Sequence, residues 1–218
     1  VMMGGWSVER EVSLVSGRAV AAALAASTYC INTLDVTRDI SALLSALDPK
    51  PNVVFNALHG RFGEDGCVQG LLVMLGIPYT HSGVLASAIA MDKPMTRHLF
   101  GEAGIPHPEG KIIAKATADK AHPMEPPYVL KPLNEGSSIG VRLVLEKEST
   151  PGLDANWSFG EHVLVERYIP GREICVAVMG ETALGAIEVQ PKEGFYDYAA
   201  KYTAGRATHQ LPAAIAVE

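Results

Sequence analysis

The chain has 218 residues, of which 48% are hydrophobic and 19% charged, and this balance is ordinary for a globular protein with a buried core. The composition excludes an intrinsically disordered chain and a collagen-like one. The formal net charge of -6 gives no support to a nucleic-acid-binding surface, which would need an excess or clustering of Lys and Arg.

The longest apolar stretch, residues 19–26, is much shorter than the roughly 20 residues that a membrane-spanning helix requires. Cys30, Cys67 and Cys175 are odd in number and widely spaced, which predicts neither a disulfide framework nor a zinc site. We therefore expect a soluble protein of the reducing cytoplasm that has no membrane partner.

The first third of the chain alternates between strand-like and helix-like patterns. Residues 1–5 are typical of the end of a strand, and the Gly4-Gly5 turn leads into apolar residues at helical spacing. Such alternation predicts a parallel sheet with helices on its faces, which binds ligands at the carboxyl ends of its strands. The Gly4-Gly5 turn and the polar loop 58–66 are therefore the expected location of a small-molecule site. The predicted elements are helices at 9–26, 39–47 and 67–75 and strands at 29–36 and 52–55.

The pattern changes in the middle of the chain. A helix is predicted over 91–103, because Gly104 and Pro106 follow it as stop signals. The proline-rich stretch 116–127 is predicted to be an exposed connection. We place the end of the N-terminal α/β unit near residue 82. Beyond residue 107, short β-rich runs separated by Gly or Pro predict antiparallel strands, at 111–114, 128–131, 139–145, 162–166, 174–179 and 183–190.

The stretch from Lys131 to Gly140 is the most informative one for function. It places a lysine at the end of a strand and, a few residues later, the hydroxyls of Ser137 and Ser138 in a flexible loop. Such a loop can surround a phosphate with backbone N–H groups and hydroxyls while the lysine neutralises its charge. The GxxxxGK[ST] order of a Walker A loop is absent, and a surface hairpin with a solvated lysine explains the stretch equally well.

Two further segments carry side chains suited to a nucleotide. Glu166 and Glu173 flank a turn, where one carboxylate could accept from an adenine amino group and the other from ribose hydroxyls. Carboxylates on a solvated turn are the simpler explanation. The aromatic run 195–202 ends in Lys201 and Tyr202, and an aromatic patch at a sheet edge explains its tyrosines better than its lysine.

Glu9 and His59 stand in the two N-terminal loops that are expected to form the site. Neither residue is specific alone. A carboxylate in the first turn of a helix is favoured electrostatically without any ligand, and a loop histidine can serve only its own hydrogen bonds.

Taken together and in order, these segments closely resemble the D-alanine:D-alanine ligases of the ATP-grasp superfamily. The resemblance extends from Val1 to about Tyr202 and rests on GGxSxEREVSLxSG, LHGxxGEDG, MDK, KPxxEGSSxG, VExxxxGxE and YDYxAKY. It implies an α/β fold, α+β in the ATP-grasp part, in which ATP lies between two antiparallel sheets. The implied domains are a substrate domain at 1–82, a central ATP-grasp subdomain at 83–167 and an incomplete C-terminal subdomain at 168–218.

The resemblance also assigns roles to single residues. It implies that Glu9 anchors the ammonium group of the first D-alanine. Ser137 and Tyr202 are implied to be linked to Glu9 by hydrogen bonds, and His59 to lie close to this substrate. The implied nucleotide contacts are Lys93, Lys131 and Lys201 with the phosphates, Ser138 in the phosphate loop, Glu166 at the adenine and Glu173 at the ribose.

The implied reaction activates one D-alanine as an acyl phosphate with ATP, and a second D-alanine then displaces phosphate to give the dipeptide for peptidoglycan. The polar segment 203–210 is expected to shield the intermediate from water. The resemblance implies Mg²⁺ as well, with ligands expected beyond Glu218, so that this chain itself is assigned no metal ligand. A homodimer is expected from the family. The alternatives are a ligase with another acceptor, such as D-lactate, and a non-catalytic nucleotide-binding domain.

Overall fold

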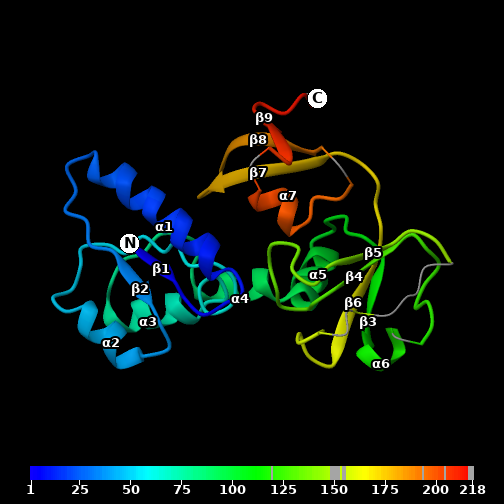
Figure 1. Ribbon diagram of the computed structural model, residues 1–218, viewed down its shortest axis with the longest axis horizontal. Coiled ribbons are helices and arrows are strands. Elements are labelled where there is room, and N and C mark those ends of the chain that lie inside the picture. The colour runs from blue at the N-terminus through cyan, green and yellow to red at the C-terminus, as the bar shows by residue number, and fades with distance from the viewer. Residues whose placement is uncertain (119, 148–152, 154–155, 193, 204, 216–218) are drawn as a thin grey trace. The chain divides into compact units, whose positions relative to one another are not determined.

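The computed structural model describes the chain except for residues 119, 148–152, 154–155, 193, 204 and 216–218. The chain divides into two compact units (Figure 1). Unit 1 comprises residues 1–107 and 133–136, and unit 2 comprises residues 108–132 and 137–218. The functional boundaries near residues 82 and 167 stay predictions.

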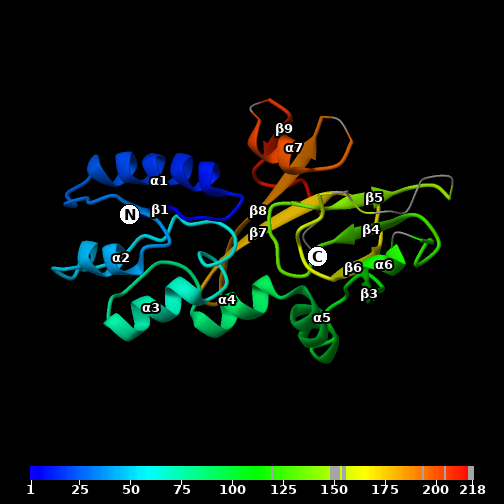
Figure 2. The same cartoon turned by 60° about the horizontal axis from the view of Figure 1, so that its bottom comes forward.

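Unit 1 is built on short parallel strands, as predicted. Strand β1 (Met2–Gly4) pairs in parallel with β2 (Leu34–Val36), and two parallel bridges, Met2 with Asn56 and Val54 with Tyr79, extend the arrangement. Helix α1 lies on one side of these strands and α3 on the other (Figures 1 and 2). The helices are α1 (Arg10–Ala25), α2 (Ile40–Ala46), α3 (Cys67–Leu75), α4 (Val84–Met91) and α5 (Lys93–Glu102).

Two strand predictions for unit 1 need correction, and one helix of unit 1 was not predicted. The strand predicted over 29–36 is only β2, and the strand predicted over 52–55 is reduced to the isolated bridges. The helix predicted over 91–103 is observed as α5, and α4, which ends just before Asp92, was not predicted. The Asp92 backbone is extended, with φ -90° and ψ 96°, and its side chain accepts the N–H of Met95. Asp92 thus ends one helix and caps the next one, of which only the second was predicted.

The core of unit 1 lies between its strands and helices. Helix α1 approaches β1 very closely at Gly17, where an added Cβ would lie 2.4 Å from the Cβ of Met3. Leu72 of α3 is completely buried, because α3 turns one apolar face inward. The buried cluster consists of Met2, Val36, Leu43, Leu47, Val54, Leu58, Val68, Leu72 and Ile77.

Unit 2 contains two antiparallel sheets, which confirms the predicted antiparallel character of this part of the chain. The four-stranded sheet has the order β3-β6-β4-β5 and the three-stranded sheet the order β7-β8-β9. The strands are β3 (Gly110–Ala114), β4 (Tyr128–Lys131), β5 (Arg142–Val144), β6 (His162–Arg167), β7 (Glu173–Met179), β8 (Thr182–Pro191) and β9 (Ala207–Gln210). The core under the larger sheet consists of Ala118, Tyr128, Leu130, Val144, Trp157, Val163 and Val165.

Two predicted loops of unit 2 contain regular structure. The stretch 116–127 overlaps the short helix α6 (Lys115–Ala118), and Ala118 is completely buried under the four-stranded sheet. The segment 203–210 ends in β9, which pairs with β8. Both segments are rich in polar and small residues, which are typical of loops, but tertiary packing orders α6 and strand pairing orders β9. In the sequence, helix α7 (Tyr198–Tyr202) lies between β8 and β9 of the three-stranded sheet.

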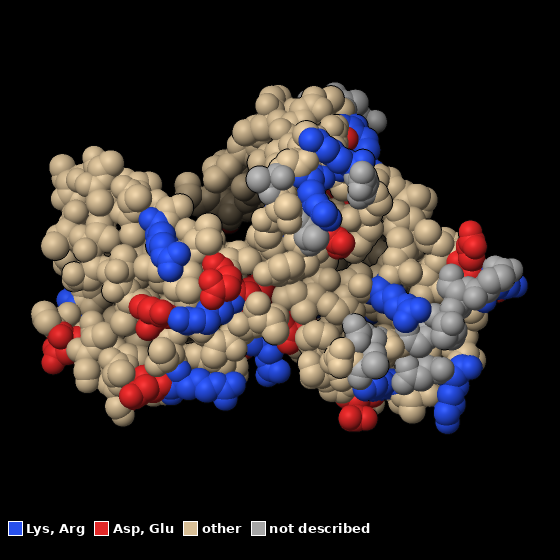
Figure 3. Space-filling model, viewed as in Figure 1, with Lys and Arg blue, Asp and Glu red and all other residues tan. Residues whose placement is uncertain are grey.

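Among the described residues, no helix is long and apolar enough to span a membrane. On the face shown in Figure 3, basic side chains of unit 1 lie beside acidic ones. Among the described residues of unit 1, this face therefore presents no continuous basic area of the kind that binds nucleic acid.

Candidate active site

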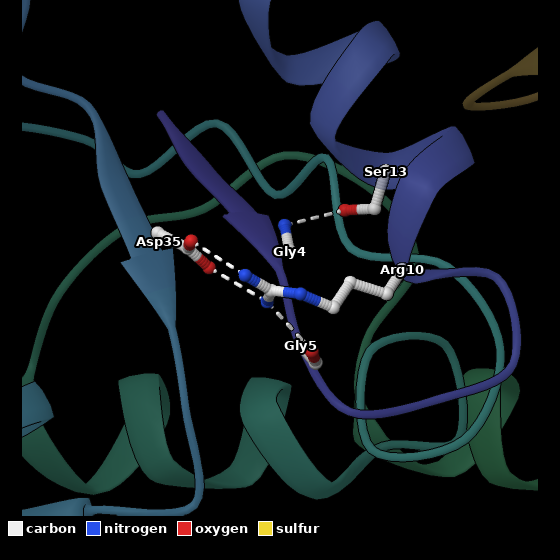
Figure 4. Close-up of polar contacts among 5 residues, drawn as sticks. All are labelled: Gly4, Gly5, Arg10, Ser13 and Asp35. Atoms are coloured by element: carbon white, nitrogen blue, oxygen red, sulfur yellow. Dashed lines mark hydrogen bonds and ion pairs between the residues drawn. The ribbon is translucent and has the colours of Figure 1, made fainter.

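In unit 1, the turn after β1 is tied to the start of α1 by polar contacts (Figure 4). The Arg10 guanidinium makes a two-pronged contact with Asp35, at 2.8 and 2.7 Å, and donates to the Gly5 carbonyl at 2.9 Å. Ser13 Oγ accepts the Gly4 N–H at 2.9 Å. Gly4 has φ +84°, and a Cβ there would lie 2.1 Å from Asp35 Oδ1, so this turn requires glycine.

These contacts fix the position of Glu9, which directly precedes α1 and is only 1% exposed. Its backbone N–H donates to Ser7 Oγ at 3.1 Å, and Ser7 Oγ donates to the His59 carbonyl at 2.8 Å. A Cβ at Gly60 would lie 2.6 Å from Glu9 Oε2. Glu9 and the loop of His59 are thus brought together, as their positions at two strand ends predict. Sequence reasoning missed Ser7, although it stands inside the first motif.

A cavity of about 370 Å³ lies beside this loop in unit 1. The His59 imidazole contacts Ser16 Oγ of α1 at 3.3 Å, and both residues line the cavity. The amide of Gln69, which is 1% exposed, donates to the Gly63 carbonyl at 2.8 Å. The remaining wall is largely apolar, so the cavity suits a small ligand with few polar groups.

Lys93 begins α5 and belongs to unit 1. Its Nζ donates to the carbonyl of Glu135, and its N–H donates to the carbonyl of Leu133 at 3.1 Å. Desolvation raises the pKa of the Glu135 carboxyl, and so does the nearby charge of Glu9, while Arg61 and Lys93 oppose the shift. The segment 133–136 is thus held among charged groups of unit 1, which the sequence did not reveal.

In unit 2, Lys131 and Glu166 form an ion pair between neighbouring strands β4 and β6. Glu166 is 6% exposed and Lys131 is half-buried. A buried carboxylate requires a partner of this kind, because an isolated buried charge is strongly unfavourable. The structure therefore brings together two residues that the sequence assigned to the same nucleotide.

The hydroxyl-rich loop of unit 2 has an unusual backbone. Ser137 and Ser138 have φ +49° and +59°, a left-handed conformation that residues with a side chain rarely adopt. Ser137 Oγ lies 2.7 Å from the Tyr202 hydroxyl, and Ser138 Oγ donates to the Tyr196 carbonyl at 3.1 Å. Such strain persists where the surroundings fix the chain, and it is concentrated at functional sites.

Lys201 of α7 lies over the ring of Tyr196, with Nζ 5.4 Å from the ring centroid. Partial desolvation raises the pKa of the Glu173 carboxyl, and the charge of Lys201 opposes this shift. Desolvation also raises the pKa of the Tyr196 phenol. The structure thus places Lys201 in electrostatic contact with Glu173, while Ser137 and Ser138 contact the segment that carries Lys201.

Within the described residues, no group of His, Cys, Asp and Glu side chains is arranged to hold a metal ion. Glu188, an acidic side chain of β8 that is 6% exposed, is ion-paired with Arg172. The Glu188 carboxylate therefore already has a cationic partner.

Two family models match the chain. The one described as D-ala D-ala ligase N-terminus matches residues 40–82, and the one described as D-ala D-ala ligase C-terminus matches residues 99–218. A D-alanine–D-alanine ligase of Chelativorans sp. (strain BNC1) is 54% identical over 219 residues, which cover 99% of this chain and 70% of that protein.

Solved structures agree with this assignment. The D-alanine–D-alanine ligase of Bacillus anthracis matches with a TM-score of 0.75 and 31% identity, covering 100% of this chain and 71% of that one. The same enzyme complexed with ATP matches with a TM-score of 0.72 and 31% identity, over 96% of this chain and 68% of that one. With its parallel α/β unit and its paired antiparallel sheets, the chain belongs to the D-alanine–D-alanine ligase family of ATP-grasp enzymes.

Proposed function

We propose that this chain joins two molecules of D-alanine into D-alanyl-D-alanine, with ATP as the energy source and a D-alanyl phosphate as intermediate. The observation that carries the proposal is the pair of left-handed serines held against the Tyr196–Tyr202 segment. This loop presents hydroxyls and backbone N–H groups together, as a transferring phosphate requires. The relative with 54% identity bears the name of this activity.

The nucleotide is assigned to unit 2 and to Lys93 of unit 1. We assign Lys131 and Lys201 to the phosphates, because a lysine neutralises the negative charge that the transferred group spreads over its oxygens. We also assign Ser138 to the phosphates, because it lies in the hydroxyl-rich loop. Glu166 is assigned to the adenine amino group and Glu173 to the ribose hydroxyls. The ATP complex of the Bacillus anthracis enzyme supports ATP as the nucleotide.

The first D-alanine is assigned to Glu9, whose buried carboxylate is suited to an ammonium group. His59 is assigned to the same substrate, since its loop is linked to Glu9 through Ser7. Ser137 and Tyr202 complete the assignment as hydroxyls that orient the substrate. The D-alanine carboxylate attacks the γ-phosphorus, ADP leaves, and the amine of the second D-alanine then displaces phosphate from the acyl carbon.

No protein nucleophile takes part in either step, so the side chains act by positioning and by charge neutralisation. An acyl phosphate hydrolyses if water reaches it, and we assign the shielding role to residues 203–210. Strand β9 anchors the end of that segment on β8. We also propose the functional boundaries near residues 82 and 167 and a place of action in the cytoplasm.

Two further parts of the proposal concern groups outside this chain. The first is Mg²⁺, which the family resemblance implies and which would neutralise charge at the phosphates. We also propose a homodimer through unit 1. Exposed apolar side chains of α3 and α4, Val73, Met74 and Leu85, support this, because large exposed apolar side chains mark association surfaces.

The test is D-alanine-dependent release of ADP and phosphate by the full-length enzyme, with chromatographic identification of D-alanyl-D-alanine. D-lactate offered as a competing acceptor separates dipeptide from ester formation. ADP release without D-alanine, or nucleotide binding without any turnover, would contradict the ligase assignment and favour a nucleotide-binding domain.

A further inference from the structure

Asp92 forms the junction between two helices of unit 1. Its backbone N–H donates to the carbonyls of Ala88 and Ile89 and so ends α4. Its Oδ1 accepts the N–H of Met95 at 2.9 Å and so caps α5. The second carboxylate oxygen is left to make another contact, and Oδ2 accepts the Asn134 side-chain amide at 3.2 Å.

The contact with Asn134 is one of a consecutive series. Leu133 accepts from the Lys93 N–H at 3.1 Å, and the Glu135 carbonyl accepts from Lys93 Nζ. Three neighbouring residues, 133–135, are thus each bound to Asp92 or Lys93, all within unit 1. Of the three hydrogen bonds described here, only the one to Asn134 joins two side chains, so it depends on the identity of both residues.

The segment bound in this way leads through Gly136 directly into Ser137 and Ser138. Their left-handed backbone is strained, and such a conformation persists only where neighbouring contacts fix the chain. A hydrogen bond to an ionised acceptor is roughly twice as strong as one between neutral groups, and it is directional. The Asp92 carboxylate is therefore well suited to set the direction from which the chain enters the serine loop.

We propose that Asp92 is a positioning residue for the nucleotide loop and that it acts through Asn134. The proposal rests on the assignment of this loop to ATP under the proposed function. It gives the Asp92 side chain two duties: one oxygen begins α5 and thereby places Lys93, and the other holds the segment that precedes the serines.

The simpler explanation is that Asp92 only caps a helix, and the chain offers a matched control for it. Asp39 caps α2 in the same way, its Oδ1 accepting the Ala42 N–H at 3.0 Å. Helix α2 carries none of the residues assigned to the site. Asp39→Ala and Asp92→Ala therefore remove equivalent caps, each at a similar loss of stability, but only Asp92→Ala also releases Asn134.

The decisive variants are made in the full-length enzyme. Asn134→Asp keeps the size of the side chain but sets one carboxylate against another. We expect it to raise KM for ATP about tenfold, the loss of one charge-assisted hydrogen bond, with a smaller effect on kcat. In the double variant Asp92→Asn with Asn134→Asp, donor and acceptor are exchanged and asparagine still caps α5. We expect KM for ATP to return to within about threefold of the original value.

The outcomes distinguish a positioning role of Asp92 from a helix cap alone. A KM for ATP in Asn134→Asp equal to that of the unmodified enzyme overturns the proposal, and so does a double variant no better than the single one. If Asp39→Ala and Asp92→Ala change KM for ATP to the same extent, Asp92 acts only as a helix cap. Asn134→Ala, which removes the contact without adding charge, gives the same comparison if Asn134→Asp does not fold. An unmodified enzyme without D-alanine-dependent turnover contradicts the proposed function instead.

Discussion

Glu135 is a carboxylate whose ionisation works against folding. Its pKa is raised, mainly by desolvation, above the ordinary value of 4.5. An acid with a raised pKa in the folded state binds more protons folded than unfolded, so stability falls as pH rises from about 4.5 through the folded pKa. The penalty is absent below that window and fully present above it.

We therefore expect Glu135→Gln to raise the stability of the protein at neutral pH and to lose this advantage in acid. Denaturant unfolding at about pH 4 and about pH 8 measures the difference. Glu181→Gln, at an exposed turn, serves as the control. A stability gain that is the same at both pH values would show that ionisation of Glu135 is not its cause.

Lys131 pairs with Glu166 in the folded protein and is assigned to a phosphate in the proposed complex. Lys131→Ala should lower nucleotide affinity by at least about tenfold and also destabilise the protein by up to about 3 kcal/mol, because it leaves Glu166 buried and unpaired. Lys131→Arg keeps the charge and should restore most of the stability. Nucleotide titration and thermal unfolding of both variants separate the effects, and an alanine variant of full stability would count against the ion pair.

At the scale of elements, the contact between α1 and β1 leaves no room for a side chain at Gly17. Gly17→Ala should destabilise the protein by about 1–3 kcal/mol through overpacking against Met3. Gly70 of α3 is the matched control, since an added Cβ there meets nothing within 4 Å. Gly70→Ala should stabilise by up to about 1 kcal/mol through helix propensity. Denaturant unfolding of the two variants should therefore give shifts of opposite sign.

Helix α7 contacts the serine loop through Tyr202. Tyr202→Phe keeps the ring but deletes the hydroxyl that lies 2.7 Å from Ser137 Oγ. We expect little change in stability, dipeptide synthesis reduced about tenfold, and some ester formation with D-lactate at lower pH, where the amine of D-alanine is protonated.

The measurement for Tyr202→Phe is a competition between D-alanine and D-lactate across pH. Tyr198→Phe is the control, because Tyr198 belongs to the same helix and its ring packs against that of Tyr202. A product ratio that is identical in the two variants would remove Tyr202 from acceptor selection.

At the scale of the whole molecule, most residues assigned to ATP lie in unit 2, whereas Glu9 and His59, assigned to the first D-alanine, lie in unit 1. An ATP analogue alone should slow hydrogen exchange in β4, β6 and α7, which carry Lys131, Glu166 and Lys201. D-alanine should instead protect the start of α1 and the loop of His59. Hydrogen-exchange mass spectrometry with each ligand tests this. Protection of β4 and β6 by D-alanine alone would contradict the division.

The order of elements could be predicted from the sequence because it depends on local patterns. Apolar spacing gave α1 and α3 almost to the residue, and β4 was predicted at its observed bounds. The start of α5 also had a local signal, an aspartate followed by Pro94 in the first turn, and it was predicted within two residues. The family could also be predicted from the sequence, because each of the ordered motifs consists of residues that are close together in the chain.

Contacts between distant residues were decided by the tertiary structure alone. The Lys131 ion pair depends on the register of β4 with β6, and Asp92 meets a residue 42 positions later. Short-range patterns carry no information about such registers, because pairing is set by how the whole chain buries its apolar surface. The sequence by itself therefore determined which chemical groups this ligase carries. Folding determined which groups share a hydrogen bond, and with it that Asn134 is held by the same carboxylate that begins α5.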